Sequence, residues 1–375
     1  QLWLLILVSL QQTTEKLLES TSQCLLKKEE EILLNKQENL LKTQKQFAEA
    51  IGMRPSHLCE LIKGKRKVTP NIADDIVRVL GGKPMFWLKL QARYEYNVIA
   101  LQEREVEEAA ASAELNSYNA IIDLRTIVKR TYDDLMESPL EMLNHLQKVL
   151  GIPNPAELQY SANGLFKKSA KTGLDPRMLM TWIVLAQSAA KREKPSIEFD
   201  KACEKDLICE CAQVLHKNEN TISAIKSALN RYGIGFCVVE KVDKASVDGF
   251  SYWEGNIPII VVSKRYNRID NLAFTIMHEL GHIFLHEKGT YINIQDYETA
   301  AKGLDLEADD YANNALIPNK VWKTLPDMPM NSYLIQRRCF AWAQSHSLNK
   351  WIVCGRVSNA TGMYKFKADK ERYIN

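Results

Sequence analysis

The residues best suited to chemistry are two histidines four positions apart, with a glutamate directly after the first. His278, Glu279 and His282 stand in the sequence His-Glu-Leu-Gly-His. On a helix, residues i and i+4 lie one turn apart on one face, so both imidazole rings can reach the same ion. Neutral imidazole nitrogens bind Zn²⁺ at about 2.0–2.1 Å. Glu279 would then stand beside the metal, where a carboxylate can take a proton from water.

A catalytic zinc site of this kind needs a third protein ligand. The long metzincin motif would place histidine at position 288, but Lys288 stands there, so that class is excluded. Several carboxylates follow His282 after 25 to 28 residues, within the segment 306–312. Among them we expect Glu307 to be the third ligand. Asp309 or Asp310 would then orient a ligand histidine through its free N–H.

His286 lies one further turn along the helix that the motif implies. It could contact a substrate or an oxyanion, but a structural role at the helix end is the favoured interpretation. The alternative for the whole motif is a helix whose two histidines are spaced by four for structural reasons. The downstream acidic segment favours the metal site.

Residues 44–63 fit the pattern of a helix-turn-helix. Apolar residues would fill the inner faces of two helices, and Gly52 would make the turn between them. Base edges are read near the start of the second helix, and the basic residues after it suit phosphates. The predicted DNA contacts are Gln44, Arg54, Ser56, His57, Glu60, Lys63, Lys65 and Arg66. The alternative is a generic small helical core with a solvated basic loop.

Charge and composition agree with one basic module on a mildly acidic body. The 375 residues carry a net charge of +3, and 46% of them are apolar, which excludes a disordered or collagenous chain. The segment 42–96 holds 11 Lys and Arg against 5 Asp and Glu. The 8 cysteines contain no C-x-x-C pair, which argues against zinc ribbons and thioredoxin-type motifs. Reduced thiols in a cytoplasmic protein are the expected state.

The patterning of the chain predicts a mostly helical α+β fold with a small sheet. Strands are expected at 233–239 and 258–262, and as short pieces at 351–353 and 363–366. Helices are expected at 222–229, 270–286 and 304–316. The apolar stretch 2–10 is about half as long as a bilayer-spanning helix, so we expect no contact with a membrane. The expected organisation is an unassigned segment 1–27, a helix-turn-helix domain 28–96 with five helices, a helical connection 97–216, a metal-site domain 217–345 and C-terminal strands 346–375.

Both halves of the chain resemble known families. Residues 44–94 resemble the Xre-type, lambda-repressor-like helix-turn-helix of HigA-like antitoxins and transcriptional regulators, through Phe47-Ala48, Gly52, Gly64-Lys65-Arg66, Thr69, Ala73 and 86–91. Residues 248–318 resemble the ImmA/IrrE zinc metallopeptidases, a zincin-like family, through 249–251, 258–260, 274–275, 278–282, 307–312 and Ile317-Pro318. The second resemblance implies His278, His282 and Glu307 as ligands and Glu279 as catalytic base.

Together the resemblances imply a regulator that binds operator DNA and cleaves a repressor or another partner protein. The substrate could add as a strand to the 258–262 strand at a sheet edge. Helix-turn-helix repressors usually read paired half-sites, so a homodimer is expected. One competing hypothesis is an antitoxin-like repressor whose peptidase domain is silent and only senses or binds a partner such as a toxin. Another is a peptidase whose helix-turn-helix serves protein contacts.

Overall fold

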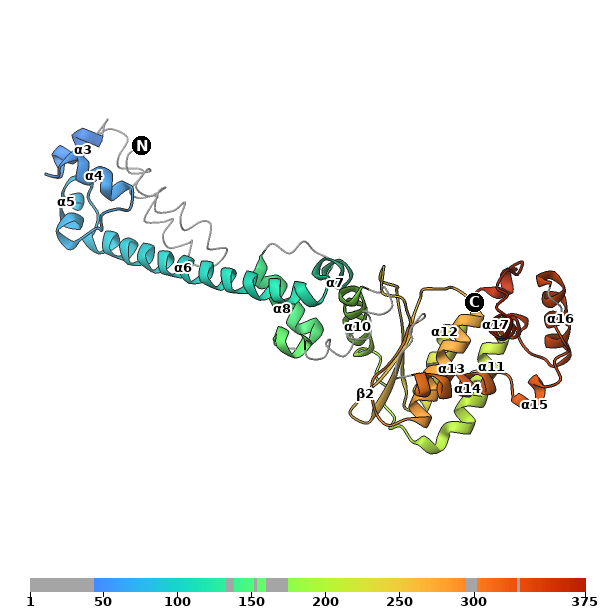
Figure 1. The fold of residues 1–375 in the computed structure, drawn as a ribbon. Coiled ribbons are helices and arrows are strands. Elements are labelled where there is room, and N and C mark those ends of the chain that lie inside the picture. Colours follow the sequence, from blue (N-terminus) through green and yellow to red (C-terminus); the bar gives the residue numbers. More distant parts are fainter. Residues whose placement is uncertain (1–43, 133–137, 152–153, 160–174, 295–301, 329–330) are drawn as a thin grey trace. The chain divides into compact units, whose positions relative to one another are not determined.

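The computed structural model describes residues 44–132, 138–151, 154–159, 175–294, 302–328 and 331–375 (Figure 1). The chain divides into two compact units, 1–111 and 112–375, which are described separately below. The mostly helical α+β class with one small sheet is confirmed. The helices expected within 28–43 and the apolar stretch 2–10 lie outside the described residues. Among the described helices, none has the length and apolar character to cross a bilayer.

The first unit is a small helical module. Its helices are α3 (Gln44–Ala50), α4 (Pro55–Ile62), α5 (Pro70–Leu80) and the first part of α6 (Pro84–Ile121). Gly52 has a φ of 70°, the left-handed turn that the sequence predicts between the first two helices. The apolar residues expected on the inner faces form the core, namely Phe47, Ala48, Ile51, Leu58 and Leu61, joined by Ile72, Ile76 and Trp87. This part of the module is therefore confirmed.

Helix α6 is longer than expected. The sequence analysis places a domain limit at 96/97, but one helix continues through it from Pro84 to Ile121. No glycine or proline stands between 85 and 121, and the segment 109–113 is rich in alanine, the best helix former. The helix ends before Asp123, whose side chain caps α7 (Leu124–Thr131).

The second unit is built around a four-stranded sheet with helices on both faces. Its further helices are α8 (Pro139–Leu150), α10 (Pro176–Ala190), α11 (Glu204–Lys217), α12 (Thr221–Arg231), α13 (Ile269–Leu285), α14 (Lys302–Leu316), α15 (Asn319–Trp322), α16 (Ser332–Ser345) and α17 (Lys350–Thr361). The strands are β1 (Gly235–Val239), β2 (Val247–Glu254), β3 (Ile257–Ser263) and β4 (Tyr291–Ile294), in the order β1-β3-β2-β4. Strand β3 runs parallel to β1 and antiparallel to β2, and β2 is antiparallel to β4.

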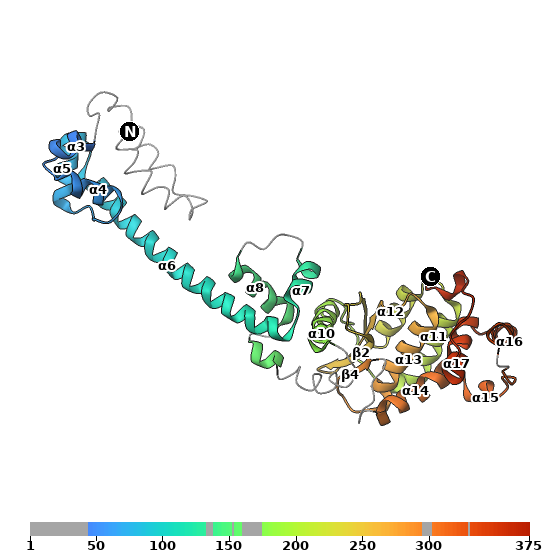
Figure 2. The ribbon, with the colours of Figure 1, turned by 45° about the horizontal axis from the view of Figure 1, so that its top comes forward.

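The sheet lies between α10 on one face and the helix layer of α12 and α13 on the other (Figures 1 and 2). Trp182 of α10 meets Phe250 of β2 edge-on, at 6.3 Å between ring centroids. Strand β3 is buried over six consecutive residues because it is covered on both faces and paired on both sides. The expectation that 258–262 forms a sheet edge is therefore wrong, since β1 and β4 are the edge strands.

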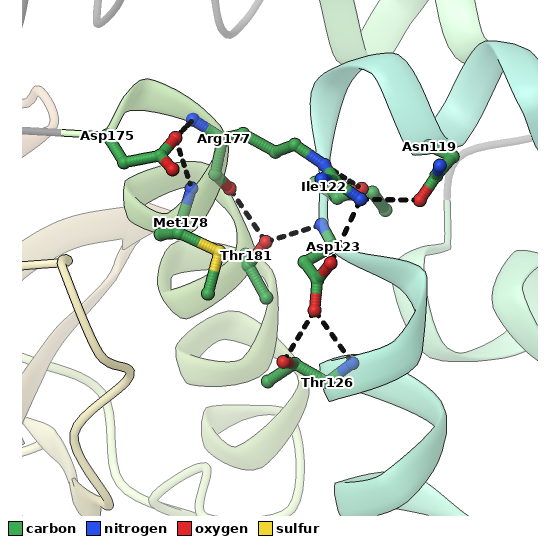
Figure 3. A network of polar contacts seen from close by, with 8 residues as sticks. All are labelled: Asn119, Ile122, Asp123, Thr126, Asp175, Arg177, Met178 and Thr181. Carbon is green, nitrogen blue, oxygen red and sulfur yellow. Dashed lines mark hydrogen bonds and ion pairs between the residues drawn. The ribbon is translucent and has the colours of Figure 1, made fainter.

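A polar network joins the end of α6 and the start of α7 to α10 (Figure 3). Arg177 donates to the carbonyl oxygen of Ile122 at 3.1 Å and to Asp123 Oδ1 at 2.9 Å. The backbone N–H of Asp123 donates to Thr181 Oγ1 at 2.7 Å, and its carboxylate accepts from Thr126. The hydrogen bonds from Thr126 and the charge of Arg177 lower the pKa of Asp123 despite the opposing effect of burial. The network satisfies polar groups at the helix ends that would otherwise lie half-buried without partners.

The strands expected in the C-terminal tail are wrong. Residues 351–353 belong to helix α17, and no strand forms at 363–366. Asn349 accepts from the backbone N–H groups of Trp351 and Ile352, at 2.9 and 3.3 Å, and so begins the helix. Four consecutive residues from Trp351 to Cys354 are buried, and such a run resembles a buried strand because α17 is covered on several sides.

Candidate metal centre

Helix α13 carries the central residues of the site through the interior of the second unit. His278, Glu279 and His282 are 3%, 0% and 0% exposed, so all three are shielded from bulk water. The helix packs closely on α14 at Gly281. A Cβ atom at this position would come within 3.1 Å of Ala308 Cα and 3.3 Å of its carbonyl oxygen. Glycine therefore lets α14 approach the histidines, at a cost of about 1 kcal/mol in helix propensity.

The two histidines point their Nε2 atoms at one another, 3.0 Å apart. Asp305 Oδ1 of α14 lies 3.4 Å from His282 Nε2, and ligand atoms of all three residues lie within 4.8 Å of one another. Ligand atoms placed tetrahedrally at about 2.0–2.1 Å from zinc are about 3.3 Å apart. Two imidazole nitrogens and a carboxylate oxygen at these separations are a donor set that fits a zinc ion.

The other ring nitrogens of the histidines contact groups that can fix their tautomers. His278 Nδ1 lies 2.7 Å from Asp309 Oδ1. His282 Nδ1 lies 2.9 Å from His286 Nδ1, and His286 Nε2 lies 3.3 Å from Glu307 Oε2. If the Nε2 atoms serve a metal, each Nδ1–H donates outward, directly to Asp309 or through His286 toward Glu307. Such outer partners commonly hold metal-binding histidines in place.

The structure therefore sorts the carboxylates of α14 differently from the sequence analysis. Asp305, which the sequence analysis missed, joins the histidine pair, whereas Glu307 contacts His286 and has a side chain 63% exposed. Asp310 is exposed and interacts with Arg356 rather than with a histidine. Asp305 and Asp309 are one turn apart and share the face of buried Ala308 and Ala312. That spacing is the signal that could have pointed to Asp305.

The Glu279 carboxylate lies between the candidate metal ligands and strand β2. Ser251 Oγ donates to Glu279 Oε2 at 2.6 Å. Glu279 Oε1 is buried and has no hydrogen-bond partner within the described part of the chain. Burial raises the pKa of the carboxyl to about 7, although neighbouring His278 and the Ser251 hydrogen bond act in the opposite direction. One oxygen is thus held, and the other is available to a small polar molecule.

Glycine in β2 leaves room for this carboxylate. A Cβ atom at Gly249 would stand 2.5 Å from Glu279 Oε1 and 2.5 Å from Thr275 Cγ2. On the neighbouring strand, the Tyr291 ring of β4 stacks on His282, at 4.4 Å between centroids and 7° between planes. Two neighbouring strands therefore define the side of the site that faces the sheet.

Electrostatics act differently on the two central histidines. For His278, burial lowers the pKa, but the hydrogen bond to Asp309 and the negative charges of Glu279, Asp309 and Asp305 outweigh it, so the pKa is raised. For His282, burial and the neighbouring histidines dominate, and the pKa is lowered although Asp305 acts against this. The acidic side chains thus favour the charged form of His278, whereas burial and the other histidines disfavour the charged form of His282.

The predicted DNA-contact residues lie in the first unit, and all of them except half-buried His57 are exposed. Gln44 begins α3, and Arg54, Ser56, His57 and Glu60 lie at or near the outer side of α4. The exposed Lys63, Lys65 and Arg66 follow α4 directly. Arg66 Nε lies 3.4 Å from Glu60 Oε2, so this pair partly neutralises its own charges. The structure thus places the eight residues on the start of α3, on α4 and on the turn after it.

Part of each unit matches a known family model. Residues 38–88 match a helix-turn-helix family, and residues 234–330 match a peptidase family described as the IrrE N-terminal-like domain. A search of curated proteins found no match to the chain. The general helix-turn-helix match does not single out HigA-like antitoxins. The chain combines a helix-turn-helix DNA-binding domain with an IrrE-like peptidase domain, which is the composition of a regulator with a peptidase module.

We predict that Gly281→Ala destabilises the second unit by about 1–3 kcal/mol, because the added methyl group meets the α14 backbone. Urea unfolding followed by circular dichroism would measure the change. Gly303→Ala is the matched control, since a Cβ atom there would have no neighbour within 4 Å. The control should be neutral or slightly stabilising. Equal stability of the two variants would contradict the close approach of the helices.

Proposed function

We propose that the protein is a transcriptional regulator that binds double-stranded operator DNA and carries a zinc-dependent endopeptidase acting on a protein partner, such as a repressor. The observation that carries the proposal is the juxtaposition of paired histidine Nε2 atoms, an acidic oxygen and the unpartnered oxygen of buried Glu279. The peptidase-family match over the same residues supports it.

The zinc ligands in this proposal are His278, His282 and Asp305. Glu307 was expected as third ligand from the sequence and remains a prediction, but the geometry favours Asp305. The Glu307 side chain is 63% exposed, and it contacts the site through His286 at the end of α13. In this arrangement Asp309, and Glu307 acting through His286, orient the rings of the ligand histidines.

Glu279 is proposed as the general base. When bound, zinc would polarise the scissile carbonyl and make a nearby water molecule more acidic. Glu279 Oε1 accepts a proton from the attacking water and later gives it to the leaving amine nitrogen. Ser251 donates to the other oxygen, Oε2, and so fixes the orientation of the carboxylate against β2.

The substrate is proposed to bind as an extended peptide along β4. This strand is an edge of the sheet and carries Tyr291, whose ring lies on His282. A peptide that pairs with the free side of an edge strand gains backbone hydrogen bonds independent of its sequence. Strand β3, the earlier candidate, has neighbours on both sides. The edge beside the histidines is therefore the better docking strand.

Metal analysis of variants should separate the two candidates for third ligand. We predict about one zinc per chain in the wild-type protein, and loss of zinc from His282→Ala and Asp305→Asn after dialysis against a chelator. Glu307→Gln should keep zinc with an affinity lowered by about 10–100-fold, as expected for an outer partner. Mass spectrometry for zinc measures this. The reverse pattern, with zinc lost from Glu307→Gln and kept by Asp305→Asn, would restore the assignment made from the sequence.

Variants of the base should separate catalysis from metal binding. We predict that Glu279→Gln retains zinc but cleaves no partner, and that Ser251→Ala retains zinc with a rate lowered by about 10–100-fold. The readout is the set of new protein N-termini in host cells expressing wild type or Glu279→Gln, found by terminal-peptide mass spectrometry. New termini that appear equally with both proteins would refute the catalytic role of Glu279.

DNA binding should depend on salt through the basic residues after α4. We predict that Lys65→Gln combined with Arg66→Gln lowers the slope of log affinity against log salt by about 2 on a duplex of random sequence. Fluorescence anisotropy would measure it. Arg78→Gln is the control, because Arg78 lies on α5 and is paired with Asp75 at 2.6 Å. An unchanged slope in the double variant would remove these residues from the DNA interface.

A further inference from the structure

Helix α6 exposes large apolar side chains along one side within the first unit. Met85, Tyr96, Ile99 and Val106 are 58%, 72%, 53% and 69% exposed. The opposite side of the same helix faces the module, where Trp87 is buried in the core and the Tyr94 hydroxyl lies against Gly64. These apolar side chains therefore do not belong to the core of the module.

The spacing of the exposed side is that of a coiled-coil seam. Eight exposed positions follow one another along the helix in alternating steps of four and three residues. They are 85, 89, 92, 96, 99, 103, 106 and 110. Apolar residues occupy six of these positions, and the other two are Lys89 and Glu103. A repeat of 3.5 residues is the pattern that lets two helices pack side by side over several turns. We call these eight positions the α6 seam.

We propose that the α6 seam is the surface on which two copies of this chain pair, as an antiparallel coiled coil. The central layers then place Tyr96 of each copy against Ile99 of the other. The same register places Met85 opposite Ala110, Lys89 opposite Val106 and Ala92 opposite Glu103. The contact is isologous, with the same surface used on both copies. It does not depend on the proposed peptidase activity.

The charges within the seam decide between the two orientations. In a parallel pair in register, Lys89 would face Lys89 and Glu103 would face Glu103, and both contacts would be repulsive. In the antiparallel register, Lys89 lies one layer from Glu103 of the other copy, and the two-fold symmetry repeats this attraction. A charged residue in a seam commonly selects orientation and register at some cost in stability.

The residues that flank the seam agree with the same register. Arg93 directly follows seam position 92, and Glu107 directly follows seam position 106. In an antiparallel pair these two flanking positions lie on the same side of the interface, so Arg93 of one copy meets Glu107 of the other. This ion pair also occurs twice by symmetry. In a parallel pair Arg93 would meet Leu88 instead. Flanking charges of this kind set the orientation of coiled coils, so two independent pairs, Lys89–Glu103 and Arg93–Glu107, favour one arrangement.

Sedimentation of the full chain over a range of concentrations tests the pairing. The wild-type protein should dimerise, and Ile99→Glu should raise the dimer dissociation constant at least about tenfold by placing charge in the central layers. Glu103→Lys should have a similar effect, and Lys89→Glu in the same chain should restore dimerisation to within about threefold. Glu105→Lys is the matched control, since Glu105 is exposed but lies outside the seam, and it should behave as wild type.

Cysteine crosslinking tests the orientation. Met85→Cys and Ala110→Cys proteins, each oxidised alone, should give no more crosslinked dimer than wild type, whereas a mixture of the two should crosslink. Crosslinked dimer above the wild-type level in the separate samples would indicate a parallel pair and overturn the proposal, and so would a mixture that gives no crosslinked dimer. A wild-type protein that stays monomeric would also overturn it. So would a monomer that loses thermal stability with Ile99→Glu, because the chain itself would then cover the seam.

Discussion

The close approach of helices α13 and α14 is the constraint on which the candidate metal centre depends. A Cβ atom at Gly281 would come within 3.1 Å of Ala308 Cα and 3.3 Å of its carbonyl oxygen, so any side chain there would push the two helices apart. This contact brings the face of α14 that carries Asp305 and Asp309 to the histidines. If α14 lay further from α13 by the width of a side chain, the two buried imidazoles would have no acidic partner. Buried polar groups without partners are costly in free energy.

Strand β2 supplies the second requirement, a place for a buried carboxylate. Gly249 leaves room for Glu279, and Ser251 gives it one hydrogen bond, so the carboxylate is held without being fully satisfied. Burial of such a group disfavours its charged form, which explains why the pKa of Glu279 rises to about 7. The buried carboxylate therefore costs stability locally, whereas the apolar residues of α13 around it belong to the core of the second unit.

Local sequence patterns predict the two histidines of the site and two strands of the sheet. Asp305 and the helical tail depend on non-local packing, which local patterns do not show. His278 and His282 depend only on helical spacing, and the two predicted strands at 233–239 and 258–262 contain short apolar runs, so each was recognised. Asp305 was missed because the choice among the carboxylates of α14 depends on which side of that helix meets Gly281. The tail resembles strands in its sequence because a helix buried on several sides loses its periodic pattern.

The continuity of α6 has a consequence for how the two functions can be separated. A boundary drawn at 96/97, where composition changes, would cut the helix in its middle and leave the last turns of one fragment and the first turns of the other without partners. Isolated short helices are marginal in water. Helix α6 also continues across the limit at 111/112 between the two units. Shuffling or proteolytic release of either portion would have to sacrifice part of that helix.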